Sequence, residues 1–227
     1  MRHSLRVQLR GLRFATHRVG QDILAELRFS GGLRRAAAGK TGLKLNIGCG
    51  PNVESGWLNL DAFHRDPEIL YFNALNPLPI AAMTVKRIHC EHFLEHLDLD
   101  HAIDFLKECY RVLEAGGTVR LIVPDVDKYI EARATKNDRF FKALSNIGNP
   151  SDPLVTPNMV INQMFRMGGD HRYAWDFETI RHFAGEIGFL TVERSALNAG
   201  PSEYAMDGQD DWRETESLYV EMTRAAG

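Results

Sequence analysis

Apolar residues along this chain fall into two alternating patterns. Short apolar runs, typical of buried strands, alternate with stretches in which apolar residues recur every three or four positions, as on one face of a helix. Because strands that alternate with helices usually form a parallel sheet, the pattern predicts an α/β fold. The short runs occupy residues 43–47, 57–61, 69–75, 87–90, 118–123, 190–194 and 216–221.

Helical periodicity is clear in two stretches. Residues 102–113 carry an apolar stripe, and we expect Ala115-Gly116-Gly117 to cap the end of that helix. Residues 178–187 carry another stripe, which Asp176 would cap at the start and Gly188 at the end.

Two neighbouring strand ends carry the first candidate chemistry. The first apolar run stops at Gly48-Cys49-Gly50, and the second ends at Asp61. Parallel strands bring such a turn and such an acid together at their carboxyl ends, where open α/β sheets bind nucleotides. Glycines let a ligand approach the backbone, and a carboxylate can accept hydrogen bonds from two ribose hydroxyls. The pattern does not fit a dinucleotide oxidoreductase, because the third glycine of that fingerprint is missing and Asp61 comes too early.

Four motifs follow one another in order within residues 43–127. Together they resemble the class I S-adenosylmethionine-dependent methyltransferases, and they are similar to the compact methyltransferases often found among surface-polysaccharide enzymes. The resemblance implies a Rossmann-like, seven-stranded, mostly parallel sheet with helices on both faces and an antiparallel last strand. The motifs are Leu45-Asn46-Ile47-Gly48-Cys49-Gly50, Gly56-Trp57-x-Asn59-x-Asp61, Leu94-Glu95-His96-Leu97 and Val123-Pro124-Asp125.

The resemblance also implies a site for S-adenosylmethionine. The glycine turn would line the methionine and ribose side, Asp61 would hold the ribose, and Asn73 with Ala74 would meet the adenine edge. Glu91 and His92 would lie beneath the sulfonium. The implied cofactor residues are Asn46, Gly48, Cys49, Gly50, Asp61, Ala62, Asn73, Ala74, Leu75, Glu91 and His92.

This sequence departs from the usual pattern of the family at three places. Asn46 and Asn73 stand where acids are common, which weakens the expected contacts to the cofactor, although an amide oxygen can still accept a hydrogen bond. Only residues 51–56 separate the first two strands, so we expect a loop or a single turn in place of the first helix.

Methyl transfer to a small-molecule acceptor is the activity that the resemblance implies, with S-adenosylhomocysteine as product. The acceptor is expected to be a sugar or glycoconjugate hydroxyl. An amine, a carboxylate, a non-methyl transfer and a non-catalytic cofactor-binding partner stay open as alternatives. A hydroxyl acceptor needs a base, because it is a poor nucleophile until it loses its proton. The candidates, in order, are His92, Asp125 and His171.

Two further expectations concern the acceptor and metal ions. Residues 146–175 show little periodicity and are expected to supply the acceptor pocket, with Met159, Met164, Phe165 and Met167 among its lining. His92 and His96 are four positions apart and could share a helix face, but no third ligand is predictable from the spacing. We therefore expect no metal, with His89 and His96 hydrogen-bonded where strand meets helix.

Charge separates an N-terminal arm from the rest of the chain. Residues 1–40 hold nine basic and two acidic side chains, whereas the whole 227-residue chain has a net charge of −3. We expect amphipathic helices in this arm, broken near Gly11 or Gly20 and ended at Gly31-Gly32, that close over the cofactor or rest on anionic lipid. Residues 41–227 would form the methyltransferase domain. An acidic body argues against nucleic acid as a partner.

Composition bears on the compartment. Apolar residues make up 44% of the chain, enough for a core, and no apolar run approaches the roughly 18 residues that cross a bilayer. The three cysteines, Cys49, Cys90 and Cys109, show no paired-thiol spacing. We expect a soluble protein of the cytoplasm, and the sequence indicates no oligomeric state.

Overall fold

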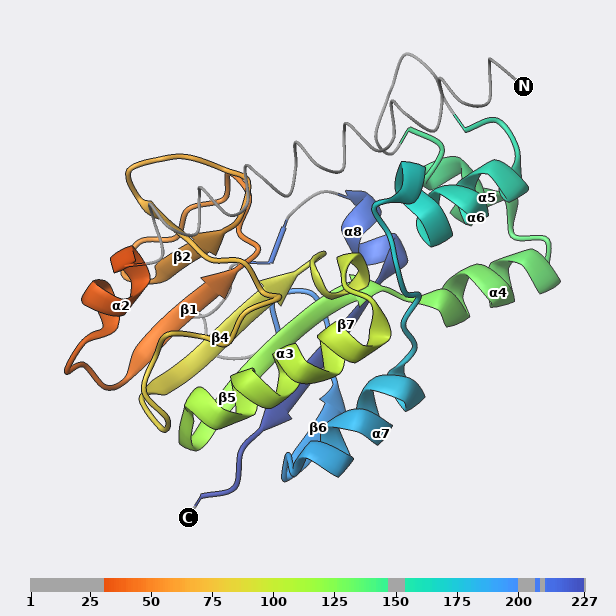
Figure 1. The fold of residues 1–227 in the computed structure, drawn as a ribbon. Helices are drawn as coiled ribbons and strands as arrows, with labels where there is room; N and C mark the ends of the chain where they lie inside the picture. Colours follow the sequence, from red (N-terminus) through yellow and green to blue (C-terminus); the bar gives the residue numbers. More distant parts are fainter. Residues whose placement is uncertain (1–30, 147–153, 200–206, 209–210, 227) are drawn as a thin grey trace, which may run out of the picture.

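A seven-stranded sheet with the strand order β3-β2-β1-β4-β5-β7-β6 forms the centre of the protein (Figure 1). The computed structural model describes residues 31–146, 154–199, 207–208 and 211–226. Only β7 runs antiparallel to its neighbours among the described strands, so the predicted Rossmann-like sheet with an antiparallel last strand is confirmed. The strands are β1 (Leu43–Ile47), β2 (Leu58–Asp61), β3 (Ile69–Tyr71), β4 (Val85–Glu91), β5 (Leu113–Pro124), β6 (Thr191–Arg194) and β7 (Ser217–Thr223).

Helices flank the sheet and gather at one end of it. In Figure 1, α3 (Leu99–Val112) and α7 (Phe177–Ile187) lie side by side across the sheet, and α2 (Gly31–Ala37) lies near β3. A second group gathers beyond the carboxyl end of β5: α4 (Val126–Ala134), α5 (Asp138–Ala143), α6 (Pro157–Arg166) and α8 (Asp211–Glu216). Two 3-10 turns, η1 (Leu94–His96) and η2 (Met167–Gly169), complete the described elements.

The central strands are buried on both faces, as a parallel sheet requires. In β5, the consecutive residues Leu121, Ile122 and Val123 are fully buried. The stripe of α3 covers this core, because Ala102, Phe105, Leu106, Cys109 and Val112 recur at helical spacing and are all buried. A smaller apolar cluster lies between α4, α5 and α6 and includes Tyr129, Phe140 and Met164.

Several local predictions are confirmed. Asp176 accepts a hydrogen bond from the backbone N–H of Thr179 at 2.7 Å and so caps α7, which Gly188 ends with a φ of +111°. Residues 51–56 form a loop with no helix between β1 and β2. Each of these signals is local in the chain, and local chemistry decides each outcome.

Other local predictions are wrong. Ala115-Gly116-Gly117 do not cap α3, since that helix passes directly into β5 at Leu113. Gly117 instead lets β5 lie close to β4, because a Cβ on it would lie 3.0 Å from the carbonyl oxygen of Val85. Gly31 and Gly32 do not end a helix but begin α2, which buries Leu33 completely.

The expected connection after residue 146 contains a helix as well. Thr156 caps α6 by accepting from the backbone N–H of Met159 at 3.2 Å, and Pro157 fills the first turn. This Thr-Pro start is a recognisable signal for a helix, and it outweighs the weak apolar periodicity that follows it.

The N-terminal arm is mostly outside the described residues. The predicted helical breaks at Gly11 and Gly20, and the lid or lipid contact, fall on residues 1–30 and stay predictions. None of the helices in the described part of the chain has the length and apolar character that a membrane crossing needs.

A buried ion network ties three strands to a distant loop. Arg120 of β5 is 1% exposed; its Nε donates to Asp207 at 2.6 Å and its Nη1 to Glu221 of β7 at 2.8 Å. Arg87 of β4 donates to the same Glu221 oxygen at 2.8 Å. Asp207 also borders the candidate site described below, so this network links the sheet to that site.

Replacing Arg120 tests this network. We expect Arg120→Met to lower the free energy of unfolding by about 3–5 kcal/mol, because it leaves the carboxylate of Asp207 buried without its cation. The control is Arg181→Ala, which breaks an exposed pair with Glu178 and should cost at most about 1 kcal/mol. Chemical denaturation measures both, and equal costs for the two variants would contradict the network's role.

Candidate functional site

Two pockets lie at the carboxyl ends of the central strands. The first, here the glycine-turn pocket, has a volume of about 430 Å³ and opens beside β1 and β4. This is where open α/β sheets place their ligands. Its lining is Asn46, Gly48, Cys49, Asn52, Val53, Glu54, His89, Glu91, Asp207, Gly208 and Arg213.

The backbone of the glycine turn, Gly48-Cys49-Gly50, has a conformation that would strain residues other than glycine. Gly48 and Gly50 have φ angles of +69° and +54°, in the left-handed region. The N–H groups of Gly48 and Cys49 donate to the carbonyl of Leu60 at 2.9 and 3.2 Å, which folds the turn back onto β2. A Cβ on Gly48 would lie 2.5 Å from the ring of Phe93, so only glycine fits there.

Asp61 and the glycine turn meet, as the sequence predicts. The carboxylate of Asp61 accepts from the backbone N–H of Gly50 at 2.9 Å, and also from Phe63 and His64 at 2.7 and 2.8 Å. These bonds take three of the roughly four acceptor positions of a carboxylate. Asp61 is 8% exposed and does not line the glycine-turn pocket. The structure therefore gives this carboxylate a role in holding the turn, with little capacity left for two ribose hydroxyls.

The amide of Asn46 has a structural reason to replace an acid. Its Nδ2 donates to the carbonyl of Asn52 at 2.9 Å and to the side chain of Asn59 at 3.0 Å. Asn59 in turn bonds the backbone of Glu54 in both directions. A carboxylate could not donate these bonds, so the amide organises the short loop of residues 51–56.

Glu91 is the main anionic group of the glycine-turn pocket. Its carboxylate accepts from the backbone N–H of Gly208 at 3.1 Å and pairs with Arg213. Burial alone would raise the pKa of Glu91, but His89, the charge of Arg213 and the N–H of Gly208 outweigh burial and lower it. Glu91 is therefore ionised at neutral pH. Gly208 and Arg213 are partners that we did not predict, because no motif marks them and they are more than a hundred residues away in sequence.

The residues predicted to contact the adenine of the cofactor lie outside both pockets. Ala62, Asn73, Ala74 and Leu75 follow β2 and β3, and none of them lines either pocket. The side chain of Asn73 accepts from the backbone N–H of Leu75 at 3.0 Å, and Leu75 is 57% exposed. The structure thus brings Asn46, Gly48, Cys49 and Glu91 together around one cavity and leaves this group outside it.

The second pocket, here the histidine pocket, adjoins the first and shares Arg213 with it. Its volume is about 230 Å³. Met164, Met167 and His171 of the predicted acceptor segment line it, whereas Met159 and Phe165 do not and are exposed. The full lining is His92, Glu95, His96, Tyr129, Leu144, Leu154, Val160, Gln163, Met164, Met167, His171, Trp212, Arg213 and Glu216.

His92 lies between acids in the histidine pocket. Its Nε2 is 2.9 Å from the hydroxyl of Ser217, and its Nδ1 is 3.4 Å from Glu95 and 4.0 Å from Glu216. Burial would lower the pKa of His92, but the closeness and charge of Glu95 and the charge of Glu216 outweigh it and raise the pKa. His92 therefore stays protonated to a higher pH than an ordinary histidine, which does not suit a base at neutral pH.

His171 differs from His92 in its protonation. Its Nδ1 meets the backbone carbonyl of Met164, and burial lowers its pKa. His171 is therefore a neutral imidazole at pH 7, with Nε2 available to accept a proton or a cation.

Asp125 lies outside both pockets. Its carboxylate caps α4 by accepting from the backbone N–H of Asp127 at 3.1 Å, and it faces Arg194 at 3.6 Å. Burial raises the pKa of Asp125, whose side chain is 3% exposed. Of the three candidate bases, the structure thus places only the two histidines at a cavity.

A pair of alanine variants tests the close fit of the glycine turn. Gly48→Ala should lower the free energy of unfolding by roughly 1–2 kcal/mol, because the backbone there is left-handed. The clash of the new Cβ with Phe93 should lower it by a further amount of about 1–3 kcal/mol. Gly56 has a similar φ of +77° with nothing within 4 Å of a built Cβ, so Gly56→Ala should show only the backbone cost. Denaturation curves compare the two, and equal losses would contradict the packing role of Phe93.

Comparison with known proteins supports the architecture. No protein-family profile and no curated protein matches the sequence. Among solved structures, the chain is similar to an S-adenosylmethionine-dependent methyltransferase of Thermotoga maritima, named as a possible histamine N-methyltransferase. That match has 17% identity and a TM-score of 0.50, and it covers 91% of this chain and 95% of the other.

Two longer proteins match less well. A Haemonchus contortus phosphoethanolamine N-methyltransferase 2, solved with S-adenosylmethionine, has 12% identity, a TM-score of 0.45 and coverage of 91% and 52%. A candidate O-methyltransferase of Nostoc punctiforme has 11% identity, a TM-score of 0.47 and coverage of 85% and 55%. This chain spans about half the length of both. The likeness to the Thermotoga protein is one of fold: this chain shares its Rossmann-like fold.

Proposed function

We propose that this protein transfers the methyl group of S-adenosylmethionine to a small-molecule acceptor. One observation carries the proposal: a cavity beside a glycine turn adjoins a second cavity lined by imidazoles, and both share Arg213. The volume of about 430 Å³ lies within the range of cofactor sites, roughly 300–1,000 Å³. The smaller cavity suits the acceptor.

Charge supports this placement of the cofactor. S-adenosylmethionine carries a sulfonium and an ammonium against one carboxylate, so it favours an acidic lining. Glu54 and Glu91 border the glycine-turn pocket together with Arg213, whereas the carboxylate of Asp207 is buried in its pair with Arg120. Glu91 stays ionised in its pair with Arg213, so this pair presents a negative group to the positive end of the cofactor and a positive group to its carboxylate.

Transfer would occur where the two pockets meet. Methyl transfer is an in-line displacement, and alignment and exclusion of water can supply most of its acceleration. A hydroxyl acceptor must also lose a proton, and we assign its removal to the side of the histidine pocket that holds His171, whose imidazole is neutral. His92, held protonated by its acidic neighbours, would position groups by donating hydrogen bonds.

A sugar or glycoconjugate hydroxyl is the acceptor that we favour. Tyr129 and Trp212 line the histidine pocket beside Glu216 and the histidines, and aromatic faces next to polar groups suit the mixed surface of a sugar. An amine or a carboxylate is the alternative, since an amine that arrives neutral needs little help from a base. We also propose that the protein is similar to the compact methyltransferases of surface-polysaccharide synthesis and that it acts in the cytoplasm.

Two measurements test the function. Titration with S-adenosylmethionine by calorimetry should show binding, and the absence of heat at millimolar cofactor would reject the assignment. Incubation with methyl-labelled cofactor and a panel of nucleotide sugars, amines and carboxylates should then give a product with the mass of one added methyl group. Binding without any methylated product would favour a non-catalytic cofactor-binding protein.

Asp61 provides a specific prediction for cofactor affinity. Asp61→Ala removes the acceptor that holds the N–H of Gly50, so the turn loses its shape and affinity for S-adenosylmethionine should fall by about tenfold or more. Asp66→Ala, in the same loop but exposed, should leave affinity unchanged. Calorimetry on both variants checks this, and an unchanged affinity of Asp61→Ala would mean that the turn does not bind the cofactor.

A further inference from the structure

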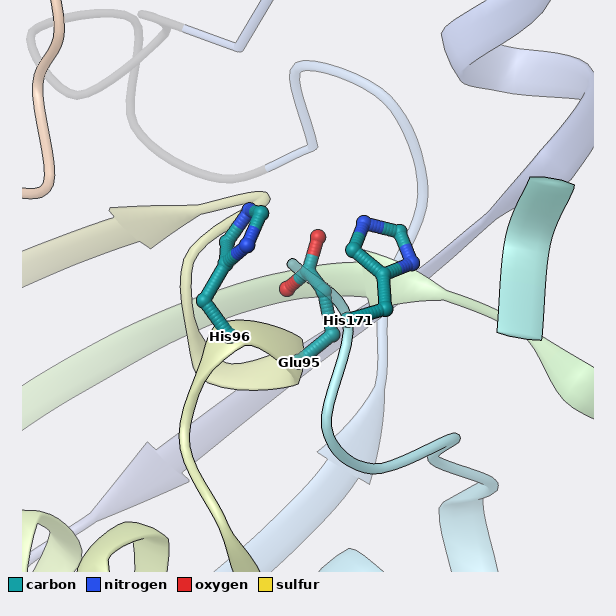
Figure 2. A group of neighbouring side chains, drawn as sticks. All are labelled: Glu95, His96 and His171. Atoms are coloured by element: carbon teal, nitrogen blue, oxygen red, sulfur yellow. The ribbon is translucent and has the colours of Figure 1, made fainter. Parts of the chain in front are cut away.

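Glu95, His96 and His171 come together at the histidine pocket (Figure 2). Each offers one ligand atom, and these atoms lie within 4.8 Å of one another. Figure 2 shows the carboxylate of Glu95 near the two imidazole rings, whose centroids lie 4.9 Å apart, with His171 coming from a different part of the chain. We propose that these three side chains bind a divalent transition-metal ion.

The two imidazoles are oriented as metal-binding histidines usually are. The Nδ1 of His96 lies 3.2 Å from the backbone carbonyl of Asp170, and the Nδ1 of His171 meets the carbonyl of Met164. A carbonyl can only accept, so each Nδ1 carries the proton and each Nε2 keeps a free lone pair. Such backbone bonds fix the tautomer and the ring orientation of histidine ligands.

Glu95 supplies an independent observation. It is 2% exposed, and neither of its carboxylate oxygens accepts a hydrogen bond within the described part of the chain. The nearest basic group is the Nδ1 of His92, 3.4 Å away. A buried carboxylate without hydrogen bonds is costly, and a bound cation between it and the two Nε2 atoms would offset that cost.

The backbone holds the ligands in place before any ion binds. The carbonyl oxygen of Glu95 accepts from the N–H of Arg172 at 2.8 Å and of Tyr173 at 3.3 Å. The turn that carries Glu95 and His96 is thereby joined to the segment that carries His171. In a tetrahedral site with bonds of roughly 2.1 Å, ligand atoms stand about 3.4 Å apart, so ligand atoms that now lie within 4.8 Å of one another would move closer together when an ion binds.

The ligand set indicates the class of ion. Two imidazoles and one carboxylate are the protein ligands of catalytic zinc sites and of non-haem iron(II) sites. Both kinds of site keep a coordination position open. Here the open position would face the histidine pocket, since all three ligands line it.

A role in catalysis follows if the proposed function is correct. With an ion bound, His171 would serve as a ligand and not as the base assigned above. The ion would bind the acceptor's hydroxyl oxygen and lower its pKa, so that the proton passes to solvent. That oxygen would then form a bond to the methyl carbon, while the bond from carbon to sulfur breaks and its electron pair stays on sulfur. The products are the methyl ether and S-adenosylhomocysteine, and the ion is unchanged.

Metal titration tests the site without reference to methyl transfer. Protein treated with a chelator and then freed of it should bind one Zn²⁺ by calorimetry, and Co²⁺ should give a visible absorption band. His171→Ala and His96→Ala should each weaken binding at least tenfold. His101→Ala is the matched control, because His101 is half exposed on α3 and should leave binding unchanged.

The outcomes separate the two proposals. Absence of Zn²⁺ binding, or binding that His171→Ala does not weaken while circular dichroism shows a folded variant, would overturn the metal site. Zn²⁺ binding by a protein that does not bind S-adenosylmethionine would support the metal site and reject the methyltransferase proposal. If methyl transfer is found, an equal rate before and after chelation would overturn the catalytic role of the ion.

Discussion

The hydrogen bond from the backbone N–H of Gly50 to the carboxylate of Asp61 is the contact on which the site depends. It joins the end of β1 to the end of β2 and holds a turn whose glycines have positive φ angles. Hydrogen bonds to a charged acceptor are stronger than neutral ones, and burial of Asp61 shields this bond from water. The glycine-turn pocket opens beside this turn.

The exit of β4 organises the other half of the site. Glu91 faces the glycine-turn pocket and pairs with Arg213, whereas Glu95, one turn later, faces the histidine pocket. His92 lies between them with a φ of +48°, in a conformation that few residues other than glycine adopt. A single short segment thus supplies an acid to each of the two cavities.

Much of this arrangement was open to prediction, because the relevant signals are local. The short apolar runs predicted the strands, and Asp176 and Gly188 predicted the two ends of α7. The order of the motifs predicted the arrangement of the sheet. The wrong predictions share a cause: Gly116-Gly117 and Gly31-Gly32 resemble helix ends, but strand pairing and core packing decide their conformation. A glycine can serve any of these purposes, and only its neighbours in space select one.

What the sequence by itself determined is the order of the strands, the positions of α3 and α7, and the meeting of Gly50 with Asp61, since adjacent strand ends follow from the parallel sheet. Only the tertiary structure decided that Asp207 and Arg213 border the first cavity, and that His171 lies beside Glu95 and His96. The physical reason is that these contacts join residues far apart along the chain. Their distances are set by the packing of whole elements, which no short pattern of residues encodes.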